Sequence, residues 1–89
     1  MFIKSGDNLL ASGSQDKSIK IWNISNGECI KTLNGHTDAV NCLSKLNDNL
    51  LASGSDDNSI KIWNILNGEC TKTLNKHTDA VKWLDYYEN

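Results

Sequence analysis

The chain has 89 residues, of which 38% are hydrophobic and 22% charged, with a net charge of −2. A chain of this length can form at most one small domain, and on its own it would be marginally stable. All nine basic residues are lysines, and no basic stripe is visible, so a nucleic-acid-binding function is not expected. No apolar run approaches the roughly 20 residues that span a bilayer, so no membrane partner is expected either.

The three cysteines, Cys29, Cys42 and Cys70, are an odd number without close spacing. They predict neither a disulfide framework nor a zinc cluster. The N-terminal residues also lack the apolar core of a signal peptide. We therefore expect an intracellular, cytoplasmic protein with free thiols, no metal and no cofactor.

An internal repeat dominates the sequence. Residues 8–40 align with residues 49–81 at an offset of 41, and 28 of the 33 aligned positions are identical. A period of 40–45 residues is typical of four-stranded propeller blades.

The predicted elements are short strands. Each repeat begins with a short apolar run and a Gly-Ser turn, and continues with a segment rich in β-branched and aromatic residues. In chain order the expected strands are 8–12, 18–24, 28–33 and 38–43, followed by their copies one period later.

Asn26-Gly27 and Asn67-Gly68 each lie between two apolar runs. Asn-Gly predicts a tight hairpin of type I′, in which both central residues have positive φ. No segment carries an apolar pattern of helical period long enough for a helix. The sequence predicts an all-β antiparallel meander.

The sequence resembles the WD-repeat (tryptophan–aspartate repeat) β-propeller family over almost its whole length. The resemblance is carried by Gly35-His36, which opens a repeat, by Trp63-Asn64, which closes it, and by the intervening LLASGSDDNSIKIWN. Trp22-Asn23 and Lys76-His77 are further copies of the two signatures. Asparagine replaces the aspartate of both closing pairs, and Lys76 replaces the glycine, from which we expect local adjustment only.

The resemblance implies antiparallel four-stranded blades and an incomplete propeller. Blade 1 would span residues 1–34, with a shortened innermost strand at 1–5, and blade 2 would span 35–75. An extra strand at 78–87 would begin a third blade. Its aromatic residues would form a recognition patch, cover an open flank or be a diverged chain end. A closed propeller needs four to eight blades, so the chain either assembles with copies of itself or is part of a longer propeller.

The residue types of His36, Ser53 and Asp57 allow two interpretations. They could form a hydrolytic triad, in which a carboxylate orients the histidine that activates the serine. By resemblance they instead form a structural tetrad with Trp63, whose indole N–H can only donate a hydrogen bond. The sequence lacks the Gly-x-Ser-x-Gly elbow of a hydrolase, so the structural interpretation is favoured and the chain is predicted not to be an enzyme.

Blade 1 carries a partial tetrad of Ser12, Asp16 and Trp22, whose histidine would lie before residue 1. His77 conversely lacks the three partners that would follow residue 89. This complementarity suggests that His77 of one copy completes the set of another copy, closing a ring of three or four chains.

By resemblance, proteins or peptides bind to one rim of the disc, and the function expected is that of a non-enzymatic protein-interaction scaffold. The alternative is a structural fragment or self-assembling repeat unit without binding activity of its own. The implied rim contacts are Gln15, Ala39, Asn41, Asp56, Ala80 and Lys82.

Overall fold

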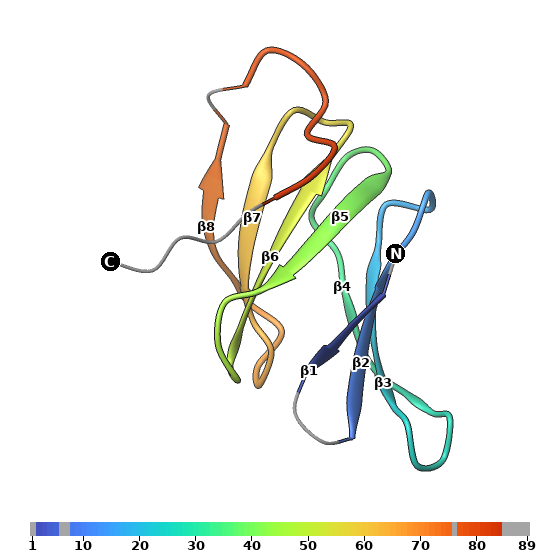
Figure 1. Cartoon of the computed structure of the whole chain (residues 1–89). Coiled ribbons are helices and arrows are strands. Elements are labelled where there is room, and N and C mark those ends of the chain that lie inside the picture. The colour runs from blue at the N-terminus through green and yellow to red at the C-terminus, as the bar shows by residue number, and fades with distance from the viewer. Residues whose placement is uncertain (1, 6–7, 76, 85–89) are drawn as a thin grey trace.

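The computed structural model of the chain describes residues 2–5, 8–75 and 77–84, and it contains two four-stranded antiparallel sheets (Figure 1). The first sheet consists of β1 (Phe2–Ser5), β2 (Leu9–Gly13), β3 (Ile19–Asn23) and β4 (Cys29–Leu33). The second consists of β5 (Val40–Lys45), β6 (Leu50–Ser55), β7 (Ile60–Asn64) and β8 (Cys70–Leu74).

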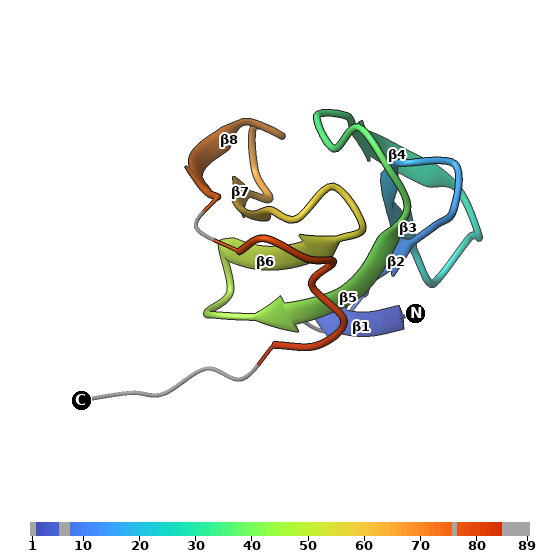
Figure 2. The same ribbon diagram turned by 90° about the horizontal axis from the view of Figure 1, so that it is seen from above.

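Each sheet is a meander, because its strands pair in chain order. The two sheets have the same register: Leu10 lies opposite Trp22 in the first sheet, and Leu51 lies opposite Trp63 in the second. Strand β5 contacts β1 and β2, and the sheets spread outward from there, with β4 and β8 at the far edges (Figure 2). The all-β fold of antiparallel sheets agrees with the sequence prediction.

The Asn-Gly hairpins form, but not as type I′ turns. Gly27 and Gly68 have φ of 75°, whereas neither Asn26 nor Asn67 has positive φ. The hydrogen bonds Asn23 N–H to Glu28 O and Gly27 N–H to Asn23 O, both 2.8 Å, enclose a four-residue loop. The Asn23 side chain shapes this loop by accepting a bond from Ser25 N–H at 2.9 Å, so only the glycine needs the left-handed conformation.

The turns between the second and third strands contain the other left-handed residues. Lys17 has φ of 78° and Asn58, one repeat later, has φ of 71°. Asparagine tolerates this conformation better than lysine, because its short polar side chain can hydrogen-bond to the nearby backbone. Nothing in the sequence pattern of residue 17 indicated such a backbone.

The hydrophobic core lies between the two sheets rather than within either one. Buried side chains of the first sheet, such as Ile19, Ile21 and Leu33, cluster with Leu51 and Trp63 of the second. Each sheet therefore uses one face to bury the facing side of its neighbour.

The segment 77–84 extends over the second sheet as the segment before β5 extends over the first. Val40 N–H donates to Ser14 O, and Val81 N–H donates to Ser55 O, both at 2.9 Å. Residues 78–84 of the strand expected at 78–87 form no strand. Residues 85–87 lie outside the described part, so the extra strand stays a prediction.

Candidate functional site

Four side chains of the second sheet form one hydrogen-bonded chain. Trp63 Nε1 donates to Ser53 Oγ at 2.8 Å, and Ser53 Oγ lies 2.6 Å from His36 Nε2. His36 Nδ1 lies 2.8 Å from Asp57 Oδ2. The structure therefore brings together all four residues predicted as a tetrad, from the segment before β5, from β6, from the following turn and from β7.

One assignment of protons satisfies every member of this chain. A neutral His36 that carries its proton on Nδ1 donates to Asp57 and accepts at Nε2 from the Ser53 hydroxyl. Ser53 Oγ can then accept from the indole of Trp63. Because no donor faces a donor, the buried network is fully satisfied, and such networks fix one arrangement of the surrounding backbone.

Asp57 is held as a carboxylate. Burial acts to raise the pKa of its carboxyl group, but hydrogen bonds from the Ser59 hydroxyl, from His36 and from the backbone N–H groups of Thr37 and Ser59 outweigh it. Thr37 N–H lies 3.0 Å from Asp57 Oδ2, and Ser59 N–H lies 2.9 Å from Oδ1. The pKa consequently lies well below its usual range.

Ser59 is a member of the site that the sequence analysis missed. Its hydroxyl donates to Asp57 Oδ1 and lies 3.3 Å from His36 Nδ1. The sequence Asp-x-Ser could have indicated it, because an aspartate often accepts a hydrogen bond from the backbone N–H of the residue two positions later. The first sheet repeats it, because Ser18 N–H and its hydroxyl both donate to Asp16 Oδ1, and the hydroxyl bond holds the pKa of Asp16 below its usual range.

The corresponding tetrad of the first sheet lacks its histidine among the described residues. Trp22 Nε1 donates to Ser12 Oγ at 2.9 Å, as in the second sheet. No imidazole contacts Ser12 within residues 2–5, 8–75 and 77–84. His77 is exposed and lies beside Ile60 of the second sheet rather than at the first sheet.

The order Ser53–His36–Asp57 is also that of a hydrolytic triad. Ser53, however, is 0% exposed, and Trp63 donates to its Oγ. A substrate carbonyl would have no path to this hydroxyl in the observed conformation. The geometry supports the structural interpretation of the four residues.

The predicted rim residues are brought together in part. Asn41 Nδ2 donates to Asp56 Oδ1 at 2.7 Å and to Val81 O at 3.1 Å. Lys82 Nζ lies 3.5 Å from the same Asp56 oxygen. The bond from Asn41 holds the pKa of Asp56 below its usual range, with a smaller effect of Lys82.

The other three predicted rim residues lie outside this cluster. Ala39 is buried, and its carbonyl accepts from Asp56 N–H at 3.0 Å. Ala80 is half-buried beside Lys82, whereas Gln15 lies exposed in the β2–β3 turn of the other sheet. The predicted rim residues therefore comprise a polar cluster on the second sheet and a separate exposed residue on the first.

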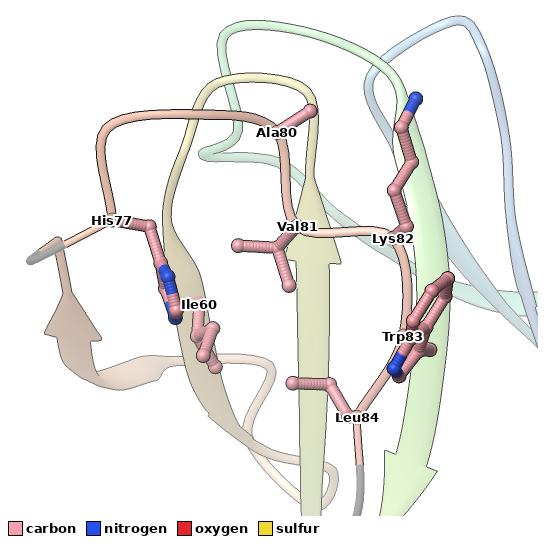
Figure 3. Close-up of a pocket in the computed structure, with 7 residues that line it drawn as sticks. All are labelled: Ile60, His77, Ala80, Val81, Lys82, Trp83 and Leu84. Carbon is pink, nitrogen blue, oxygen red and sulfur yellow. The ribbon is translucent and has the colours of Figure 1, made fainter.

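An open hollow of about 330 Å³ lies where the segment 77–84 passes over the second sheet. His77 and Ile60 lie on one side of it in Figure 3, and Lys82 and Trp83 lie on the other. The complete lining is Ile60, His77, Ala80, Val81, Lys82, Trp83 and Leu84. Trp83 is 79% exposed, which makes it the most exposed of the large hydrophobic side chains described.

The cysteines and other polar groups suggest no further chemistry. Cys29 and Cys70 are exposed free thiols on the outer strands, and Cys42 is buried, which raises the pKa of its thiol. Within the described part of the chain, no group of three or more histidine, cysteine or acidic side chains could hold a metal ion. The same residues contain no helix long and apolar enough to cross a membrane.

Two solved structures resemble the chain closely. They are described as the structure of U3-55K and the crystal structure of RRP9 WD40 repeats, and each superimposes with a TM-score of 0.85 at 37% identity. Each match covers 92% of this chain and 26% of the other. The chain thus spans about a quarter of these structures.

Curated relatives match over a single repeat. An uncharacterized WD repeat-containing protein of Schizosaccharomyces pombe is 62% identical over 32 residues, which are 36% of this chain and 9% of that protein. The nuclear distribution protein PAC1 of Arthroderma otae is 58% identical over 33 residues, or 37% of this chain and 7% of that protein. The family model described as "WD domain, G-beta repeat" matches residues 2–23 and 27–64. The chain belongs to the WD-repeat family, as the sequence signatures predicted.

Proposed function

We propose that the chain is a segment of a non-enzymatic protein-interaction scaffold that binds peptides or protein domains through its rim. The observation that carries this proposal is the cluster of Asn41, Asp56 and Lys82. It joins the turn after β6 to the segment that follows β8, and it offers a carboxylate, an amide and an ammonium group at the surface. A polar cluster held by hydrogen bonds on packed strands is suited to orienting hydrogen bonds with a partner.

The proposed absence of enzymatic activity is supported by the burial of Ser53. A fluorophosphonate that reacts with activated serines is expected to leave this residue unlabelled in the folded chain. Labelling at Ser53 that is lost in His36→Ala would instead establish hydrolase chemistry.

The proposed compartment is the cytoplasm. It rests on the exposed thiols of Cys29 and Cys70, since the reducing cytosol keeps such groups free.

The rim proposal is tested with peptides selected from a random displayed library against the folded chain. We expect Asp56→Ala and Lys82→Ala to weaken their binding at least about tenfold, as hot-spot residues do. Asp48→Ala is the matched control, because Asp48 is an exposed acidic residue in the β5–β6 turn, at the opposite end of the sheet. Equal binding by the rim variants and the wild type would contradict the rim proposal.

A further inference from the structure

The two near-identical repeats have the same residues in different environments on one flank. Leu33 of the first sheet is 2% exposed, whereas Leu74, its counterpart in the second sheet, is 47% exposed. Ile19 and Ile60 differ in the same direction, from fully buried to half-buried. The apolar flank that is buried on the first sheet is therefore exposed on the second.

The opposite flank shows the reverse. Ile65 of the second sheet is 2% exposed and Ile24 of the first sheet is 49% exposed. Trp63 is buried, while its counterpart Trp22 is half-buried. The apolar flank that is buried on the second sheet is therefore exposed on the first.

We infer that copies of this chain assemble head to tail, with the flank of Leu74 and Ile60 in one copy packed on the flank of Trp22 and Ile24 in the next. The chain forms this same interface internally, between its two sheets, from the same residue types in the same register. Association through these flanks does not require peptide binding at the rim, so either proposal can fail without the other.

The segment 77–81 would bridge two copies as 36–40 bridges the two sheets. Both segments have the sequence His-Thr-Asp-Ala-Val. Both end on a valine packed over a glycine: a Cβ added to Gly13 would lie 2.7 Å from Val40 Cγ1, and one added to Gly54 would lie 2.5 Å from Val81 Cγ1. At the start of its segment, His36 forms a hydrogen bond with Ser53 of the second sheet. By the same geometry, His77 would form a hydrogen bond with Ser12 of the next copy.

The register of β1 leaves room for this segment. Phe2 lies opposite Ser12 as Leu43 lies opposite Ser53, so β1 corresponds to β5 only from Leu43 onward. The place that residues 36–41 take on the second sheet is not filled on the first sheet by any described residue. Residues 77–82 correspond to it one period later. The innermost strand at the interface between two copies would thus have two parts. One copy would supply the first part from the segment that begins at His77, and the other copy would supply the second part as β1.

This interface joins two different surfaces, so each copy can bind one partner on each side and the assembly can close into a ring. Light scattering of the purified chain is expected to give a fixed multiple of the single-chain mass at micromolar concentration. A single-chain mass up to millimolar concentration would overturn the inference.

Charge introduced on either flank tests which surfaces meet. Leu74→Lys and Ile24→Lys place an ammonium group on side chains that are half-exposed in one copy and would be buried in the joint. Each variant alone is expected to have the single-chain mass with an unchanged circular dichroism spectrum. Leu66→Lys is the matched control, because Leu66 is 69% exposed in the β7–β8 loop, and it should assemble as the wild type does. Assembly of either flank variant at wild-type strength would contradict the proposed interface.

Mixing the two blocked variants gives a sharper test. Leu74→Lys retains an intact Trp22 flank and Ile24→Lys retains an intact Leu74 flank, so an equal mixture should form a one-to-one dimer and nothing larger. A mixture that stays at the single-chain mass, or that forms larger species, would overturn head-to-tail packing.

The same mixture tests the role of His77. His77→Ala in the copy that supplies the segment is expected to weaken the dimer about 3- to 10-fold, the value of one or two hydrogen bonds. Thr78→Ala in that copy should leave the dissociation constant unchanged. If His77→Ala also left the dissociation constant unchanged, the interface would consist of apolar contacts alone. The proposal that His77 bonds to Ser12 of the next copy would then be wrong.

Discussion

Ser53 and Ser12 are the same residue of the repeat in two different environments. Ser53 is fully buried between Trp63 and His36, whereas Ser12 is half-buried and bonded to Trp22 alone. The Ser53 hydroxyl therefore satisfies two buried groups, and the Ser12 hydroxyl satisfies one that water can reach.

Replacing each serine by alanine should show this difference. Ser53→Ala leaves the Trp63 and His36 nitrogens without a partner, and we expect it to lower the free energy of unfolding by about 1–3 kcal/mol. Ser12→Ala should cost less than about 1 kcal/mol, because water can replace the lost hydroxyl. Urea denaturation of both variants measures the two values. Equal losses would show that the network adds nothing beyond the Trp–Ser bond.

Asp57 should make stability depend on acid pH. Its carboxyl pKa is depressed in the folded chain by hydrogen bonds that the unfolded chain lacks, so the unfolded state binds the proton more readily. The carboxylate then stabilises the fold above the unfolded pKa of about 4, and this contribution is lost as the pH falls through the lower folded value.

Asp57→Asn removes this dependence. The variant should be less stable than the wild type at pH 7, and the difference should shrink on acidification below about pH 4. Thermal unfolding from pH 7 to pH 2 measures it. Asp48→Asn, which alters an exposed carboxylate paired with Lys45, is the control and should follow the wild-type curve. A pH-independent difference for Asp57→Asn would contradict the argument.

The sequence allowed some of these residue-level interactions to be predicted. The grouping of His36, Ser53, Asp57 and Trp63 came from a resemblance, and the structure places them within hydrogen-bond distance of one another. Ser59 was missed because a serine two residues after an aspartate is usually interpreted as part of a turn rather than as part of a buried network.

Among the elements, the turns between the second and third strands offer a direct comparison. Lys17 and Asn58 occupy the same position with φ of 78° and 71°. Lys17→Asn should therefore raise the free energy of unfolding, and Asn58→Lys should lower it, each by up to about 1 kcal/mol. Chemical denaturation of both variants checks the pair. The same sign for both changes would show that the side chains, not the backbone, determine the effect.

The strands could be predicted from the sequence more accurately than the turns. Alternating β-branched and aromatic residues are sufficient to locate β3 and β7, and the repeat indicates their common register. Asn26-Gly27 predicted a hairpin correctly but its type wrongly. The side chain of Asn23, three residues earlier, accepts a backbone bond and begins the loop before the Asn-Gly pair is reached.

In the whole molecule, stability depends on the junction between the sheets. Leu33→Ala removes a buried side chain from this junction and should cost about 2–5 kcal/mol. Leu74→Ala changes the same residue of the other repeat on a free flank, and in dilute solution it should cost less than about 1 kcal/mol. Thermal or urea denaturation at low protein concentration measures both. Equal costs would place the core within each sheet instead.

This asymmetry was not predictable from the sequence. Leu33 and Leu74 lie in identical Lys-Thr-Leu-Asn contexts, so no local pattern distinguishes the buried copy from the exposed one. Two repeats predict two blades. Which side chains of each blade are buried depends on the sheet that packs against it, and the sequence of one repeat does not contain that information.

The identity of β3 and β7, both Ile-Lys-Ile-Trp-Asn, has a consequence for how the chain reaches this structure. Strand β2 gains the same side-chain contacts from either of them, so the energies of native and exchanged pairings differ little. The choice between them is made by the short turn after β2, since closing a short loop costs less entropy than closing one that spans a whole repeat. Refolding should therefore divide into a fast fraction with local pairing and a slow fraction that must first release exchanged strands.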